Sequence, residues 1–139
     1  MTGYAGDLTP AEAWELLHAQ ADAVLVDVRT GQEWREIGVP DTVPPASPPA
    51  FVEWVDSAGR PNPRFVADLE ALGLLPGSER PVVFLCRSGV RSVHAARAAT
   101  AAGLGPAYNV LEGFEGGMDA QGRRGYEGWR VAGLPWHHG

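Results

Sequence analysis

Two apolar runs rich in β-branched residues constrain the fold of this chain more than any other feature. Residues 23–29 read AVLVDVR and residues 81–85 read PVVFL. Runs without polar alternation are typical of strands that are buried on both faces, and such strands occur in parallel sheets covered by helices. The two runs therefore predict the centre of a parallel sheet.

Helix signals alternate with these strands along the chain. Thr9 and Glu12 form one capping-box pattern, with Pro10 at the first helical position, and Thr30 and Glu33 form a second. Further helices are expected after Asn62 and over the alanine-rich residues 92–102, and further strands over 51–55 and 107–111. The alternation predicts an α/β fold with a central, mostly parallel sheet of about five strands and helices on both faces.

The length of the chain is that of one domain, which we expect to cover residues 1–139. The formal net charge of −6 argues against nucleic acid as a partner. The longest apolar run is far shorter than the ~20 residues of a membrane span. The N-terminus also lacks the pattern of a secretory signal, so a cytoplasmic protein without membrane association is expected.

Two segments have the composition of irregular structure. Residues 40–50 contain five of the twelve prolines and predict a surface loop. Residues 113–128 are rich in glycine and are interpreted as an insertion, which either covers the functional crevice or forms a surface loop.

The single cysteine, Cys86, follows the apolar run 81–85 directly, and Arg87 and Arg91 come next to it in the sequence CRSGVRS. A glycine-containing turn between a strand and a helix can direct successive backbone N–H groups toward one point. The N-terminus of the helix adds partial positive charge there. Thiols in such surroundings have pKa values below the usual value of about 8.5, so the pattern predicts a reactive thiolate in an anion-binding loop.

A structural role for this cysteine has to be weighed against a reactive one. A lone cysteine at the end of an apolar strand is most often a small core residue. Arginines at the start of a helix, however, oppose the helix dipole at a cost of about 0.3–1 kcal/mol each unless an anion compensates them. Two of them beside a thiol and a glycine favour a reactive site.

The sequence resembles the rhodanese-like (sulfurtransferase) family. The resemblance rests on CRSGVRS at residues 86–92, on VDVRT at 26–30 followed by Glu33 and Trp34, on YNVLEGF at 108–114, and on GWRVAGLPW at 128–136. These motifs follow the order of the family over almost the whole chain. The resemblance implies a single rhodanese-like domain.

It also implies that Cys86 holds sulfur as a persulfide and passes it to an acceptor. The loop residues would bind the substrate, namely Arg87, Ser88, Gly89, Val90, Arg91 and Ser92. Asp27, Arg29 and Trp34 are candidates for supporting positions around them. The expected partners are a small anionic sulfur donor such as thiosulfate and a thiol or cyanide-like acceptor, which a protein can also supply. No metal or organic cofactor is expected, and both a monomer and a homodimer stay open.

Two other functions fit parts of the pattern. Cysteine phosphatases, including a group with the rhodanese fold, have five residues between cysteine and arginine, whereas four separate Cys86 from Arg91. The shorter loop suits one sulfur atom better than a phosphoryl group, so phosphate or arsenate chemistry is the weaker alternative. A rhodanese-like module that binds without turnover is the other, and the presence of Cys86 disfavours it.

Overall fold

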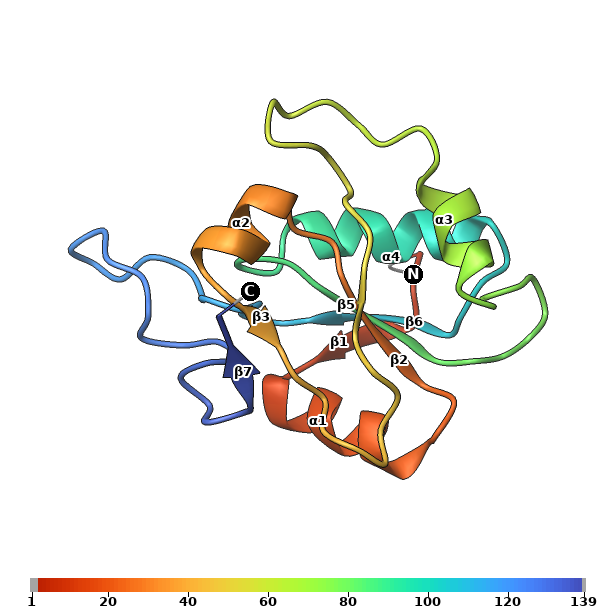
Figure 1. Ribbon diagram of the computed structural model, residues 1–139, viewed down its shortest axis with the longest axis horizontal. Coiled ribbons are helices and arrows are strands. Elements are labelled where there is room, and N and C mark those ends of the chain that lie inside the picture. Colours follow the sequence, from red (N-terminus) through yellow and green to blue (C-terminus); the bar gives the residue numbers. More distant parts are fainter. Residues whose placement is uncertain (1–2, 139) are drawn as a thin grey trace.

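The computed structural model describes residues 3–138. A five-stranded sheet in the order β1-β6-β5-β2-β4 forms its centre (Figure 1). The strands are β1 (Gly6–Leu8), β2 (Val24–Asp27), β4 (Ala50–Phe51), β5 (Val82–Leu85) and β6 (Ala107–Val110). Every neighbouring pair in this sheet is parallel. The prediction of a largely parallel sheet of about five strands is confirmed.

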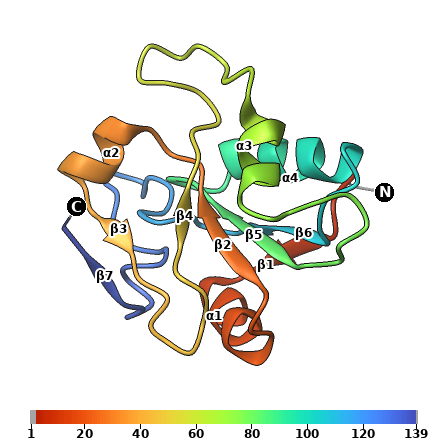
Figure 2. The ribbon, with the colours of Figure 1, turned by 45° about the vertical axis from the view of Figure 1, so that its right-hand side comes forward.

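Helices cover both faces of the sheet (Figure 2). They are α1 (Pro10–Ala19), α2 (Gly31–Glu36), α3 (Phe65–Ala71) and α4 (Arg91–Ala101). Thr9 and Thr30 cap α1 and α2, and in both helices the predicted capping box is complete. Both strand-to-helix connections that concern function, β2 to α2 and β5 to α4, are therefore short and leave the sheet at the same end.

Alternate residues of the strands divide the core into two layers. On one face, Val26 and Phe84 pack with Leu69 of α3 and with the small side chains Ala95 and Ala99 of α4. On the other face, strand residues such as Leu25 and Leu85 pack with Leu17 of α1 and with Trp129 from the C-terminal region. Alanines along α4 allow this helix to lie close to the sheet.

The strand predicted over 51–55 is wrong in extent. Only Ala50 and Phe51 are register partners of β2 residues, although the N–H groups of Val52 and Trp54 still donate to the carbonyls of Asp27 and Val28. Val55 instead forms an isolated bridge with Pro61. Local β-branched and aromatic content favours an extended backbone, but at a sheet edge the length of pairing depends on how far the neighbouring strand continues, and β2 ends at Asp27.

A second, two-stranded sheet joins β3 (Val39–Pro40) to β7 (Trp136–His137) in antiparallel pairing. It brings the C-terminal region beside the segment that follows α2 (Figure 2). Residues 116–127 project from the body of the molecule as an irregular loop (Figure 1); that this glycine-rich region is an insertion stays a prediction. No helix between residues 3 and 138 has the length and apolar character needed to cross a bilayer.

Candidate active site

The carboxyl ends of β2 and β5 lie next to each other in the sheet. Asp27, the last residue of β2, is the register partner of Leu85, and Cys86 follows immediately. Ligands of parallel α/β sheets bind beyond this edge. The neighbouring register therefore brings together the two motifs that lie 59 positions apart in the chain, counted from Asp27 to Cys86.

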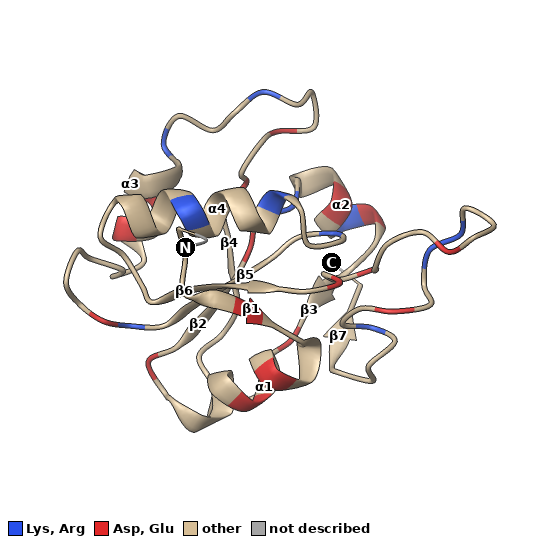
Figure 3. Ribbon diagram, turned by 180° about the vertical axis from the view of Figure 1, so that it is seen from behind, with Lys and Arg blue, Asp and Glu red and all other residues tan. Residues whose placement is uncertain are grey.

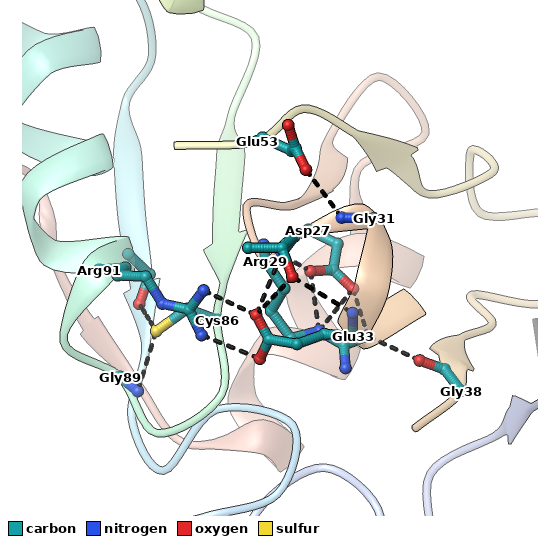
Figure 4. Close-up of polar contacts among 11 residues, drawn as sticks. Asp27, Arg29, Gly31, Glu33, Gly38, Glu53, Cys86, Gly89 and Arg91 are labelled. Carbon is teal, nitrogen blue, oxygen red and sulfur yellow. Dashed lines mark hydrogen bonds and ion pairs between the residues drawn. The ribbon is translucent and has the colours of Figure 1, made fainter. Parts of the chain in front are cut away.

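The sulfur of Cys86 is buried but lies among polar atoms. The residue is 1% exposed. The backbone N–H of Gly89 donates a hydrogen bond to its Sγ at 3.1 Å, and the hydroxyl of Ser92 lies 3.1 Å from the same atom. Figure 4 shows the sulfur between the glycine amide and the first turn of α4. Cys86 also belongs to the apolar core, together with Phe84 and Ala95, and it forms no disulfide in the described part of the chain.

Most backbone N–H groups of the loop after Cys86 donate no hydrogen bond to another protein atom in the described chain. Among residues 3–138, the N–H groups of Ser88, Val90, Arg91 and Ser92 have no protein acceptor. They come from the turn before α4 and from its first residues, where a helix leaves its N–H groups without intrahelical partners. Gly89 has φ +95°, which allows the turn, and a side chain there would come within 3.3 Å of the Val110 carbonyl oxygen. That these free N–H groups bind an anion stays a prediction.

The two arginines of the loop have different surroundings. The guanidinium of Arg91 is paired with the Glu33 carboxylate through two hydrogen bonds, at 2.8 and 3.0 Å (Figure 4). This pairing raises the pKa of Arg91, and the charges of Cys86 and Asp27 raise it further. Burial alone would raise the pKa of Glu33, but the hydrogen bonds from Arg91 and Thr30 and the arginine charges outweigh it and leave the pKa below its ordinary value.

Arg87 is exposed and makes no ion pair with any residue from 3 to 138. It lines a cavity of ≈ 350 Å³ at the carboxyl end of the sheet. The other lining residues come from α2 and its cap, from the turn after β4 and from the segment after β6, namely Thr30, Gln32, Glu33, Glu36, Ile37, Ser57 and Glu115. Figure 3 shows how the charged residues of α2 and of the start of α4 gather at this end of the molecule. Arg87 is therefore the loop arginine that is exposed to the cavity, whereas Arg91 is engaged by Glu33.

Asp27 and Arg29 form a fully buried ion pair. Arg29 donates from its backbone N–H, its Nε and its Nη2 to the Asp27 carboxylate, with the shortest contact at 2.7 Å, and both side chains are 0% exposed. Nη2 also donates to the Gly38 carbonyl, and the guanidinium lies 4.2 Å from the Phe114 ring centroid. The pair holds β2, the end of α2 and the segment after β6 together. It does not contact Cys86 directly in the hydrogen bonds of the structure.

Trp34 lies on α2, half-buried, with its ring edge-to-face against Phe51 at 5.3 Å between centroids. Its Nε1 is buried without a hydrogen-bond partner among the described residues. The residue does not line the cavity beside Arg87. Trp34 thus packs against Phe51 beside the site, and its supporting role stays a prediction.

The segment after β6 supports the cysteine loop through its backbone. The N–H of Phe114 donates to the Cys86 carbonyl at 2.8 Å, and the N–H groups of Glu115 and Gly116 donate to the Arg87 carbonyl. Gly113 has φ +65°, and a Cβ atom there would lie 2.5 Å from the Cys86 carbonyl oxygen. Only glycine fits so close a backbone contact, and the start of the glycine-rich region is therefore part of the site.

Three of these supporting residues do not stand out in the sequence as members of the site: Glu33 as the partner of Arg91, Gly113 and Asn109. Asn109 accepts a short hydrogen bond from the Ser92 hydroxyl. A buried asparagine in the apolar strand 107–110 is a signal that can be recognised, because buried polar side chains need partners. The identity of those partners depends on which strands are neighbours.

The chain is similar to known proteins over nearly its whole length. The family model of the rhodanese-like domain matches residues 9–120. A crystal structure of Rv0390 from Mycobacterium tuberculosis is 52% identical, with a TM-score of 0.88 over 98% of this chain and 99% of that one. A Rhodopseudomonas palustris CGA009 protein of unknown function, described as a possible tyrosine phosphatase, is 27% identical, with a TM-score of 0.57 over 96% and 85%.

A sequence relative from Rickettsia rickettsii, named only as the uncharacterized RP600 homolog, is 31% identical over 94% of this chain and 95% of its own length. The matched family model covers the capped helix α1, the Cys86 loop and the segment that supports it. With its parallel sheet and strand-loop-helix cysteine site, this chain belongs to the family of rhodanese-like domains.

Proposed function

We propose that this protein is a sulfurtransferase in which Cys86 carries sulfur between an anionic donor and a thiophilic acceptor. The observation that carries the proposal is the arrangement of amides around the sulfur. One N–H, from Gly89, binds Sγ, and four neighbouring N–H groups have no protein acceptor. Such a set of donors stabilises negative charge on an atom attached to the sulfur.

The reaction needs two displacements and no net oxidation. The Cys86 thiolate attacks the outer sulfur of thiosulfate, the new S–S bond forms, and the bond to the sulfonate breaks as sulfite leaves with the electron pair. The persulfide carries its charge on the outer sulfur, within reach of the loop amides. An acceptor such as cyanide or a thiolate then attacks that outer sulfur, and the electron pair of the broken S–S bond returns to Cys86.

The cavity beside Arg87 supports the choice of an anionic donor. Three carboxylates line it: Glu33 is paired with Arg91, Glu115 lies 3.9 Å from Arg130, and Glu36 accepts from Gln32. Arg87 has no carboxylate partner in the described chain. We propose that the donor enters through this cavity with Arg87 guiding it.

Mass spectrometry of the intact protein tests the proposal directly. After incubation with thiosulfate and removal of small molecules, we expect a mass gain of one sulfur atom that disappears with cyanide. Cys86→Ser must abolish the gain, because the chain has no other thiol on which a persulfide can form. A protein that gains no sulfur from thiosulfate, polysulfide or an organic persulfide contradicts the proposal.

A phosphatase is the second candidate because the Rhodopseudomonas palustris neighbour is described as a possible tyrosine phosphatase. The four-residue spacing between Cys86 and Arg91 and the engagement of Arg91 with Glu33 both disfavour it. Hydrolysis of p-nitrophenyl phosphate separates the two functions. Turnover that depends on Cys86, in a protein that accepts no sulfur, would replace the sulfurtransferase proposal.

A further inference from the structure

A chain of hydrogen bonds runs from Cys86 to an exposed carboxylate on the edge strand of the sheet. The Ser92 hydroxyl contacts the sulfur and donates to Oδ1 of Asn109. The Asn109 Nδ2 group donates to Oδ1 of Asp7 at 3.0 Å. Asp7 and Asn109 are register partners on the adjacent strands β1 and β6, so this last bond is part of the sheet geometry.

The direction of each bond follows from the carboxylate at the end. A carboxylate can only accept, so the side chain of Asn109 has to present its NH₂ group to Asp7 and its carbonyl oxygen to Ser92. Tyr4 donates to the same oxygen of Asp7 at 2.7 Å. That bond is the main cause of the raised pKa of Tyr4, consistent with Asp7 acting as an acceptor.

The orientation of Asn109 determines where the hydroxyl proton of Ser92 lies. Ser92 has one proton, and the Asn109 oxygen requires it. The contact between Ser92 and the sulfur is then a hydrogen bond only if the Cys86 thiol donates. A thiolate has no proton to donate to Ser92. It therefore either faces a lone pair of the Ser92 oxygen or accepts the Ser92 hydroxyl proton, in which case the hydrogen bond from Ser92 to Asn109 is lost.

We propose that Asp7 and Asn109 are positioning residues that direct the Ser92 proton away from Cys86 and so favour its neutral thiol over its thiolate. Cys86, Ser92 and Asn109 are each at most 1% exposed, so water cannot easily replace the lost bond. The relay opposes the loop amides, which favour the thiolate. The free sulfur is thereby kept less reactive than the loop amides alone would make it.

The benefit to catalysis rests on the sulfurtransferase function proposed above. In a persulfide, the inner sulfur is uncharged and the negative charge lies on the outer sulfur. The inner sulfur therefore needs no hydrogen bond from Ser92, and the Ser92 hydroxyl can continue to donate to Asn109. The loop amides meanwhile bind the outer sulfur. The relay thus destabilises the empty thiolate relative to the loaded enzyme.

Asp7→Asn is the variant that separates orientation from shape. A carboxamide at position 7 can donate to Asn109, which lets the Asn109 side chain turn and give its own NH₂ to Ser92. The Ser92 hydroxyl can then donate its hydrogen bond to the Cys86 sulfur. We expect the pH midpoint of Cys86 alkylation by iodoacetamide to fall by about 0.5–1 pH unit, the equivalent of one net hydrogen bond.

The loss of a negative charge also favours a thiolate through space, so Ser92→Ala serves as the matched background. The other charges that face the site are Arg87, Arg91 with Glu33, the pair Asp27 and Arg29, and Glu115, and these are the same in all four proteins. A relay through Ser92 predicts that Asp7→Asn shifts the midpoint in the serine background and has little effect in the alanine background. Equal shifts in both, or no shift with serine present, overturn the proposal.

If the alanine variants do not fold, the shift caused by Asp7→Asn can instead be measured at several salt concentrations. A through-space effect of Asp7 shrinks as ionic strength rises, whereas the effect of hydrogen-bond orientation persists in high salt. A shift that vanishes at high salt contradicts the relay. Alkylation needs only the thiol, so it tests the relay independently of sulfur transfer. If Asp7→Asn shifts the alkylation midpoint but no persulfide forms, the relay stands and the proposed function fails. If a persulfide forms but the midpoint does not shift, the function stands and the relay fails.

Discussion

The carboxylate of Glu33 accepts two hydrogen bonds from the guanidinium of Arg91, which lies 58 positions later in the chain. The contact joins the first turn of α2 to the first residue of α4, and the side chains are only 18% and 24% exposed. Glu33 also completes the capping box of α2. One carboxylate therefore stabilises the start of its own helix and holds the arginine of the cysteine loop.

Removal of the Arg91 side chain should destabilise the protein. Arg91→Ala leaves the Glu33 carboxylate half-buried without its main partner, and hydrogen bonds to charged groups are worth about 1.5–3 kcal/mol. We expect a loss of this size in the free energy of unfolding, measured by urea denaturation. Arg91→Lys should restore only part of it, because lysine cannot form the two parallel bonds. A full rescue by lysine would contradict the bidentate role.

The stability contributed by Glu33 should depend on pH. Its pKa is lower in the folded protein than the ordinary value of 4.5. The contribution is therefore complete above this value and is lost as the pH falls through the lower folded pKa. Glu33→Gln, which cannot ionise, should be less stable than the parent protein at pH 7, and the difference should narrow below about pH 4.5. Thermal melts from pH 3 to 7 measure this, and a difference that widens toward acid pH refutes it.

Arg87 should affect the binding of an anionic donor rather than the chemistry. Arg87→Ala is expected to raise the apparent KM for thiosulfate several-fold while leaving the KM for an uncharged persulfide donor nearly unchanged, because only the first substrate carries charge to the cavity. Arg80→Ala is the matched control, since it removes the same charge just before β5, at the opposite end of that strand. Equal effects of Arg87→Ala on both donors exclude a role in donor steering.

Gly113 should tolerate no side chain. In Gly113→Ala the new Cβ atom meets the backbone of Cys86 and Arg87 at 2.5 Å, and the positive φ adds strain. Gly122 also has positive φ, +76°, but nothing lies within 4 Å of its Cβ position. We expect Gly122→Ala to keep sulfur transfer near the parent level and Gly113→Ala to lose most of it. Comparable persulfide yields for the two variants would show that the close contact is dispensable.

Asp27→Asn should be strongly destabilising because it leaves the buried charge of Arg29 without its counterion. Breaking a buried pair from one side costs about 3–5 kcal/mol, a large part of the 5–15 kcal/mol that stabilises a typical domain. Arg123→Ala, which breaks a surface pair with Asp119, provides the comparison and should change the melting temperature far less. Similar losses for the two variants would mean that the buried pair adds no more than a surface one.

Local patterns in the sequence were enough to predict the capped helices and the central strands, and they point to Cys86 as the candidate nucleophile. Thr9 with Glu12 and Thr30 with Glu33 are three residues apart, and bonds over that distance form within a single turn of chain. The apolar runs at 23–29 and 81–85 likewise predict buried strands without reference to the rest of the molecule. The edge strand β4 differed in extent and the short strands β1, β3 and β7 were not predicted, because such pairing depends on a partner rather than on a strand's own residues.

The roles of the residues around Cys86 could not be predicted in the same way. Arg87 and Arg91 look equivalent in the sequence, yet Arg91 is paired with Glu33 and Arg87 lines the cavity. Asn109 looks like a polar residue in a strand, and its contact with Ser92 exists because β6 lies beside β5. Each of these roles depends on a neighbour that is distant along the chain.

The sequence by itself determined the parallel α/β architecture, the capped helices and a lone thiol at a strand-to-helix turn, because hydrophobic period, capping and turn chemistry act between residues a few positions apart. Only the tertiary structure decided which arginine is engaged, where the Ser92 proton is directed and why position 113 must be glycine. The order of the strands sets those contacts, and bonds between side chains require the few ångströms of separation that packing alone provides.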